Sequence, residues 1–225
     1  MAQAQKAELE SPGSNYLLVE GIDDWHIHSH LRTCESDFGI GYCGNDESLL
    51  DKLSAVIVGS KTTKSILGAV LDADPDTGVA ARLESIKNRL QPAYDLPRAF
   101  PPEGLILKPR ETQPNHDRLP VIGIWLMPDN TRDGILEDLL RLAMPRKSEE
   151  YIAQAVDKAK RDGVAGFRDV ERSKAIIKTH IAWQDPNMKN LGEALHNHFE
   201  NLSSALRGFL DWRGRLFGDA HDKIP

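Results

Sequence analysis

The sequence has few cysteines, no long apolar run and no excess of basic charge. Its two cysteines, Cys34 and Cys43, lack the paired spacing of a zinc site, and we expect both to be reduced thiols. No apolar run approaches the roughly 20 residues that a membrane span needs. With 28 basic and 34 acidic residues, the formal net charge is −6, which differs from the basic surface of proteins that bind nucleic acid mainly through phosphates. Any contact with nucleic acid must therefore come from a local patch or through metal ions.

The N-terminal residues 1–15 are polar and lack the basic start and apolar centre of a signal peptide. We interpret them as a disordered leader and predict a cytoplasmic protein with no membrane partner. The length of 225 residues allows one large domain or a domain with an extension, and we favour the second.

Short apolar runs alternate with amphipathic segments over the first 90 residues or so. We expect strands at 16–21, 38–43 and 65–74, and helices at 23–32, 47–59 and 76–90. This alternation indicates an α/β fold with a mostly parallel sheet flanked by helices. Two later apolar runs predict strands that form a hairpin at the sheet edge, at 104–108 and 120–130.

The last third of the chain is helical by its periodicity. We expect helices at 134–144, 148–163, 169–184 and 191–217. The chain therefore divides into an α/β domain at 16–145 and a helical C-terminal extension at 146–225 that packs on it.

Carboxylates stand where the predicted strands end. Glu20 ends the first strand, and Asp24 follows in the first turn of the next helix. Asp72 and Asp74 end the third strand, and in extended backbone their side chains point to the same side. The carboxyl ends of the strands in an open α/β sheet meet at one edge, where ligands usually bind. We therefore expect these side chains to lie close together.

Carboxylates gathered in this way repel each other and take up protons unless a divalent cation is present. Ligand sets of oxygen alone suit Mg²⁺ or Mn²⁺ better than Zn²⁺. Magnesium keeps several waters and bridges to phosphate, so this pattern favours phosphoryl transfer on nucleic acid.

The sequence VEG, followed about fifty residues later by DAD, resembles the motifs of a Toprim domain across residues 16–145. Topoisomerases, DnaG-type primases, recombination-mediator proteins and OLD-family (overcoming lysogenization defect) nucleases share this Rossmann-like fold. The segments VEGIDD, VLDADPD, GIWLMPDN and GILEDLL are also similar to a Toprim-like family of uncharacterised prokaryotic proteins, nearest to the OLD nucleases. That closer resemblance includes the C-terminal third.

The resemblance implies roles for particular residues. Glu20 corresponds to the general acid or base of Toprim domains and lies among the metal ligands. Asp72 and Asp74 correspond to the metal-binding DxD pair, and Asp24 to the additional acidic residue of OLD-type domains.

Two further OLD features are carried over by their order in the chain. The later acidic ligand corresponds to Glu137, although its neighbour Asp138 stays open as the ligand. The late lysine corresponds to Lys174, which would stabilise charge on the phosphate.

Three more side chains are candidates for supporting the site. Asp76 and Asp129 follow predicted strands, although a carboxylate at a helix start or a turn has a structural reason to be there. His28 lies one turn after Asp24 and could orient it. We expect His26 and His30 to be solvated, because three histidines spaced by two share a face only on a strand.

We therefore expect a Toprim-type nuclease or related phosphotransfer enzyme that uses Mg²⁺ or Mn²⁺ on DNA or RNA. The sequence contains no ATPase motif, which typical OLD proteins carry, so a partner ATPase stays open, as does a homodimer. The alternative is a non-catalytic module that binds a metal or a nucleotide and regulates a multi-protein, defence-type system. A third interpretation is a small-molecule phosphohydrolase.

Overall fold

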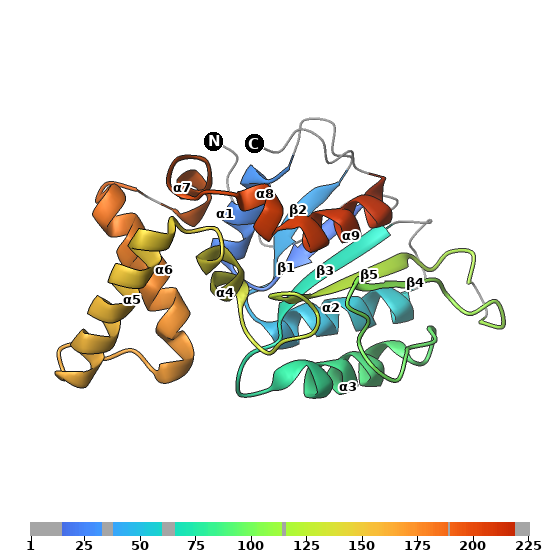
Figure 1. The fold of residues 1–225 in the computed structure, drawn as a ribbon. Coiled ribbons are helices and arrows are strands. Elements are labelled where there is room, and N and C mark those ends of the chain that lie inside the picture. Colours follow the sequence, from blue (N-terminus) through green and yellow to red (C-terminus); the bar gives the residue numbers. More distant parts are fainter. Residues whose placement is uncertain (1–14, 33–37, 60–65, 114–115, 189, 219–225) are drawn as a thin grey trace.

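The computed structural model describes residues 15–218 except 33–37, 60–65, 114–115 and 189 (Figure 1). Cys34 and residues 1–14 of the predicted leader lie outside the described residues. Cys43 is a buried free thiol, as predicted. Among the described residues, none of the helices has the length and apolar character that a membrane span requires.

Five strands form a single sheet. They are β1 (Tyr16–Val19), β2 (Gly39–Tyr42), β3 (Ile66–Asp72), β4 (Leu105–Leu107) and β5 (Val121–Met127). Their order is β2-β1-β3-β5-β4, and every neighbouring pair is parallel except β4 with β5. The predicted α/β fold, with its mostly parallel sheet and antiparallel edge pair, is confirmed.

Helices cover both faces of this sheet. They are α1 (Ile22–His30), α2 (Asp46–Gly59), α3 (Gly78–Leu90), α4 (Leu136–Arg141), α5 (Arg146–Arg161), α6 (Arg172–Gln184), α7 (Leu191–His198), α8 (Leu202–Ala205) and α9 (Arg207–Phe217). Figure 1 shows α2 and α3 on one face, and α1 and α9 on the other. The single helix predicted at 191–217 is wrong, because Asn201 has a left-handed φ of 54° and the segment forms three helices.

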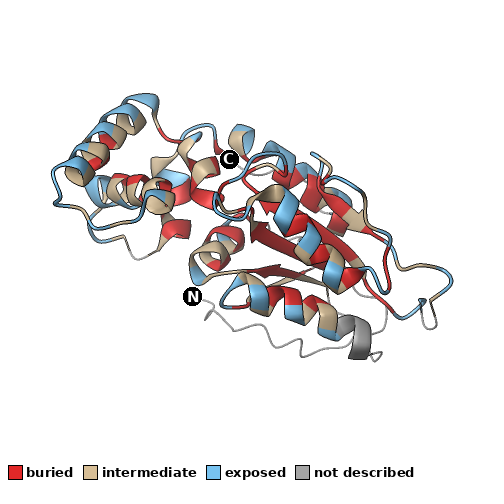
Figure 2. Cartoon of the chain, turned by 90° about the horizontal axis from the view of Figure 1, so that it is seen from below, coloured by how far each residue is buried: buried red, intermediate tan, exposed pale blue. Residues whose placement is uncertain are grey.

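Alternation along the strands divides the apolar core into two layers. Leu17 and Val19 of β1 belong to the layer beneath α1 and α9, whereas Leu18 belongs to the layer against α2 and α3. Residues of β5 divide in the same way. The sheet is therefore buried on both sides, as Figure 2 shows by its red strands.

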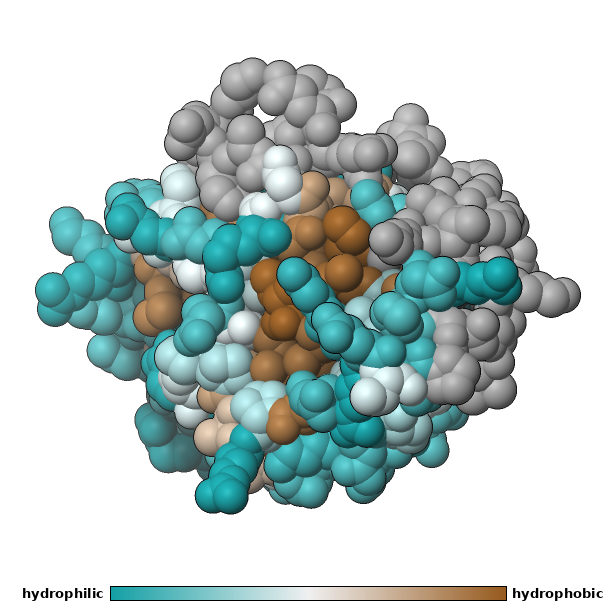
Figure 3. Space-filling view, turned by 90° about the vertical axis from the view of Figure 1, so that its right-hand side faces the viewer, coloured by the Kyte–Doolittle hydropathy of each residue, from teal (hydrophilic) through white to brown (hydrophobic). Residues whose placement is uncertain are grey.

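The helix α9 closes one face of the sheet. Gly123 of β5 lets Leu216 come so close that an added Cβ would lie 2.3 Å from the Leu216 Cδ2 atom. The helical part of the chain is therefore integral to the core of the α/β fold. On the side of the molecule away from α5 and α6, Figure 3 shows apolar residues gathered in a hollow between hydrophilic ones.

Candidate active site

The ends of the two central parallel strands are joined by a side-chain hydrogen bond. Glu20 directly follows β1, and Asp72 is the last residue of β3. The backbone N–H of Asp72 donates to Oε1 of Glu20 at 2.8 Å. Because β1 and β3 pair in parallel, both side chains stand at the same edge of the sheet. The structure thus brings together the two residues that anchor the predicted site.

Asp24 enters the same site from the first turn of α1. Its Oδ2 accepts a hydrogen bond from the N–H of Gly21 at 2.9 Å, which caps the helix. The structural role foreseen for a carboxylate at a helix start is therefore real. Its charge also reaches Asp72, since Asp24 is the first of the charges that raise the pKa of Asp72.

The start of α4 supplies the fourth carboxylate. The N–H of Leu136 donates to Oδ1 of Asp72 at 3.1 Å, so the helix begins against the end of β3. The next residue, Glu137, has a side chain that is 6% exposed. Its Oε1 lies 3.7 Å from Nζ of Lys174 on α6. We call Glu20, Asp24, Asp72 and Glu137 the carboxylate site.

Burial and mutual repulsion raise the pKa values of these carboxyl groups. Loss of hydration raises the pKa of Glu20 to about 7 and that of Asp24 to about 6. The pKa of Asp72 is raised well above its usual range, first by burial and then by its carboxylate neighbours. Burial also raises the pKa of Glu137. The metal-free site therefore keeps protons at pH values at which exposed carboxyl groups have lost them.

Lys174 is a cation beside these carboxylates. Burial alone would lower its pKa, but Glu137, Asp72 and Asp24 raise the pKa above the ordinary value. Lys174 therefore stays protonated, and its position on α6 ties the C-terminal helices to the carboxylate site. Glu137 and Lys174 were assigned to the site only by their order in the chain, and the structure brings the two side chains together.

The premise that Asp72 and Asp74 share one side of an extended strand is wrong. The strand β3 ends at Asp72, and Asp74 has a left-handed φ of 39°, so the alternation does not continue. Oδ2 of Asp74 lies 3.3 Å from Nη2 of Arg82, which donates a hydrogen bond to it. Asp74 therefore lies beside the carboxylate site, with its charge partly compensated.

Arg82 of α3 lies at the carboxylate site, although the sequence analysis did not predict it there. Its side chain is 3% exposed. It donates to the carbonyl oxygen of Asp72 at 3.1 Å and to Oδ2 of Asp46 at 2.6 Å. Burial would raise the pKa of Asp46, but the hydrogen bond from Arg82 holds that pKa below its usual range. Arg82 thus links the end of β3 to Asp46 at the start of α2.

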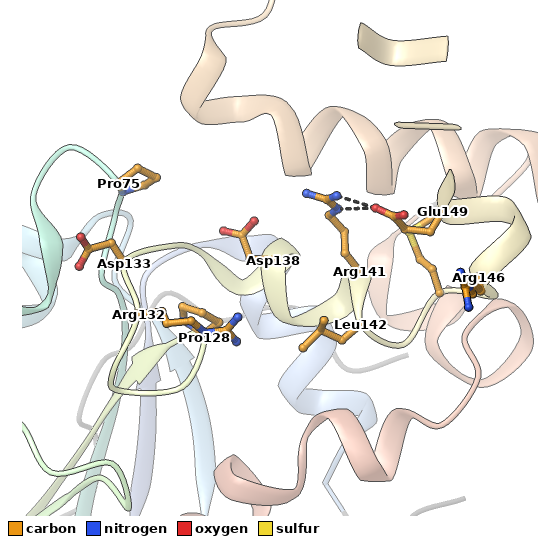
Figure 4. A pocket seen from close by; sticks show the side chains of 10 residues that line it. Pro75, Pro128, Arg132, Asp133, Asp138, Arg141, Leu142, Arg146 and Glu149 are labelled. Carbon is orange, nitrogen blue, oxygen red and sulfur yellow. Dashed lines mark hydrogen bonds and ion pairs between the residues drawn. The ribbon is translucent and has the colours of Figure 1, made fainter. Parts of the chain in front are cut away.

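The carboxylate of Asp138 makes hydrogen bonds that stabilise the fold and does not join the carboxylate site. Its Oδ2 accepts from the N–H of Ile135 at 2.9 Å, and its Oδ1 accepts from the hydroxyl of Ser173. Figure 4 shows Asp138 facing a separate cavity of about 630 Å³, between Asp133 and Arg141. Of the two adjacent acids, the structure therefore places Glu137 in the site.

The side chain of Asp129 is bonded within its own turn, and that of Asp76 is exposed. Oδ1 of Asp129 accepts from the N–H groups of Thr131 and Arg132, and Asp129 thereby closes a turn. At the start of α3 the capping carboxylate is that of Asp133 rather than that of Asp76, because Oδ1 of Asp133 accepts from the N–H of Val79 at 2.8 Å. The loop after β5 thus holds α3 in place.

The expectation that His28 orients Asp24 is also wrong. His28 is 1% exposed and its ring lies 4.9 Å from that of Phe209, in the core under α9. Neither ring nitrogen has a hydrogen-bond partner within the described part of the chain. Burial lowers the pKa of His28 to about 3, so the ring is neutral. His30 is exposed, as predicted, whereas His26 is half-buried.

The donor atoms of the carboxylate site fit a hard divalent cation. Glu20, Asp24 and Asp72 each use one oxygen for a backbone N–H, and the other oxygen remains for a ligand. Across the described ranges, no three carboxylate, imidazole or thiol groups are close enough to hold a metal ion directly. An ion at this site would therefore be held by one or two of these carboxylates and by water, which is how proteins usually bind Mg²⁺.

Replacement of Glu20 should change how stability depends on pH in the metal-free protein. The carboxyl group titrates at about 7 in the folded state, against 4.5 as its ordinary value. The folded state therefore binds more protons between these values, and the free energy of unfolding falls as pH rises through this window. In Glu20→Gln this contribution is absent, so the variant should gain up to about 3 kcal/mol on the wild type between pH 4.5 and 7.5.

Urea denaturation with a chelator present, at several pH values, measures this difference. Glu84→Gln on the exposed face of α3 is the matched control and should show no such trend. A stability difference between Glu20→Gln and the wild type that stays constant with pH would contradict the buried, repelled state of Glu20.

The comparisons with known proteins give one match. The model of a family described as Protein of unknown function (DUF3226) matches residues 14–218. This span includes the whole carboxylate site and extends through α9. No curated protein and no solved structure matches the chain.

Proposed function

This chain belongs to the family described as Protein of unknown function (DUF3226), and from the site itself we propose that it is a metal-dependent phosphoryl-transfer enzyme that cleaves DNA or RNA. The observation that carries the proposal is the pairing of Glu20 and Asp72 across the ends of β1 and β3. Buried carboxyl groups with raised pKa values, at the carboxyl edge of a parallel sheet, are typical of catalytic sites. The resemblance of VEG and DAD to Toprim motifs supports the same chemistry.

The surroundings of each residue in the site suggest a different chemical role for it. A bound Mg²⁺ or Mn²⁺ would polarise the phosphodiester and lower the pKa of a bound water. Glu20 has a pKa of about 7 and can therefore exchange a proton near neutral pH. Asp72 and Asp24 offer oxygens to the cation, and Glu137 holds Lys174 toward the site. The protonated Lys174 can then stabilise negative charge on the phosphate.

An assay of purified protein tests this proposal. Plasmid, linear and single-stranded DNA, and RNA, are incubated with Mg²⁺, with Mn²⁺ or with a chelator. We expect cleavage of at least one substrate with either cation and none with the chelator. Cleavage at the same rate in the presence of the chelator would contradict the proposal that the activity depends on a metal ion.

A second function is favoured by the separation of the carboxylates. Because no three of the described carboxylate, imidazole or thiol groups are close enough to hold a metal ion together, the site can also serve a regulatory module that binds a nucleotide, or a metal through one or two carboxylates, without cleaving anything. In that case the protein gains thermal stability from Mn²⁺ or from nucleotides, but every nucleic acid stays intact. The same assay therefore decides between the two functions.

A further inference from the structure

A second cavity, of about 270 Å³, lies next to the carboxylate site. It is formed between α6, the start of α1 and the segment that leads into α7. Ile177, Ile181 and Leu191 line its apolar wall. Small-molecule sites typically combine such a wall with a few polar groups, and this cavity has both.

Glu137 belongs to the cavity and to the carboxylate site at once. It lines the cavity, and its carboxylate is the one that lies 3.7 Å from Lys174. Asp23, another lining residue, directly precedes Asp24. A molecule in the cavity would therefore meet a carboxylate that also belongs to the carboxylate site.

The charge around the cavity determines which part of a nucleotide can enter it. Asp23, Glu137 and Asp185 are acidic, and among the described residues that line the cavity Lys178 is the one basic residue. Nζ of Lys178 lies 3.9 Å from Oδ2 of Asp23, so its charge is already partly compensated. Lys174, which does not line the cavity, partly compensates Glu137, and the carboxylate oxygens of the lining still accept hydrogen bonds from N–H groups more readily than they admit a phosphate. A flat, apolar group that carries N–H donors fits this combination.

We propose that the cavity binds a nucleobase with an exocyclic amino group, namely adenine, guanine or cytosine. This inference rests on the proposed function, because it places the phosphate of the same nucleotide at the carboxylate site. Such bases carry an amino group that donates to the carboxylates of Asp and Glu, whereas uracil and thymine offer only an imide N–H that stands between two carbonyl oxygens, which a carboxylate repels. Along α6, Ile181 is about 10 Å from Lys174, which leaves room for a sugar between the phosphate and the base.

The proposal also defines the form of the substrate. A base can reach the cavity only after it has left its stack, so the nucleic acid must be single-stranded or locally opened. We therefore expect single-stranded substrates to be preferred over intact duplex.

Titration calorimetry with mononucleotides tests the cavity without any cleavage. In Mg²⁺, CMP should bind about tenfold more tightly than UMP, because UMP lacks the amino donor to a carboxylate. Ala182→Trp, which fills the cavity from α6, should weaken CMP at least tenfold. Val164→Trp places the same side chain at an exposed position outside the cavity and should leave CMP unaffected.

Asp23→Asn provides a second test that does not depend on filling the cavity. It should narrow the preference for CMP over UMP while the protein keeps its fold, as followed by circular dichroism. Equal affinities for CMP and UMP, no binding of either, or unchanged CMP binding in Ala182→Trp would overturn the inference. If wild-type protein binds CMP selectively but cleaves no nucleic acid, the proposed function fails and the cavity assignment stands. If the wild-type protein cleaves nucleic acid but binds CMP and UMP equally, the cavity assignment fails and the proposed function stands.

Discussion

Glu20→Gln should reduce cleavage by about 10²- to 10⁴-fold, the range typical for loss of a general acid or base. The amide can still accept the hydrogen bond from the N–H of Asp72, so the ends of β1 and β3 should stay in place. What the substitution removes is the negative charge and the ability to exchange a proton near pH 7. Initial cleavage rates at saturating Mn²⁺ measure the loss.

Two comparisons make this result specific to Glu20. Glu84→Gln, on the outer face of α3, should cleave at the wild-type rate. Thermal unfolding should show that Glu20→Gln is folded and, without metal at neutral pH, at least as stable as the wild type. A Glu20→Gln protein that cleaves at more than half of the wild-type rate would exclude Glu20 from the chemistry.

Asp72→Asn should weaken Mn²⁺ binding at least tenfold and remove the gain in melting temperature that the cation gives. Asp72 is the residue on which the charges of Asp24, Glu20 and Glu137 converge, so its own charge is the one most needed by a cation. The asparagine oxygen can still accept from the N–H of Leu136, which keeps α4 in position. A ligand that binds only the folded state raises its stability in proportion to the logarithm of its concentration, so melting curves at increasing Mn²⁺ report the affinity.

The control for Asp72→Asn is Asp76→Asn, four residues later in the same connection. Asp76 is exposed and outside the carboxylate site, so this variant should keep the Mn²⁺-dependent stabilisation. If Asp72→Asn is stabilised by Mn²⁺ as strongly as the wild type, the cation does not bind between β1 and β3.

The edge of the sheet where the site lies could be predicted from sequence. Short apolar runs that alternate with helices require parallel strands, and parallel strands end together. Glu20 and Asp72 were predictable for this reason, because each directly follows or ends a buried strand. Lys174 was placed by a family resemblance alone, since nothing local on α6 distinguishes it from its neighbour Lys178.

Other parts of the site depend on contacts between distant segments. Arg82 belongs to an amphipathic helix, where a charged residue usually faces solvent, and its burial follows from contact with Asp46 and the end of β3. Asp74 leaves the predicted side because its backbone turns at a left-handed φ. His28 was predicted to orient Asp24 because it lies one turn later on α1. The packing of α9 buries its ring in the core instead. Sequence periodicity carries no information on these contacts.

The position of a bound cation tests the central claim most directly. Crystals soaked in Mn²⁺ should show an anomalous density peak between Glu20 and Asp72, with oxygen ligands at about 2.1–2.2 Å, close to the distances typical of Mg²⁺. The same soak of Asp72→Asn crystals should leave this place without a peak. A manganese ion found only elsewhere, or a wild-type peak that persists in Asp72→Asn, would contradict the assignment of the carboxylate site as a metal-dependent catalytic centre.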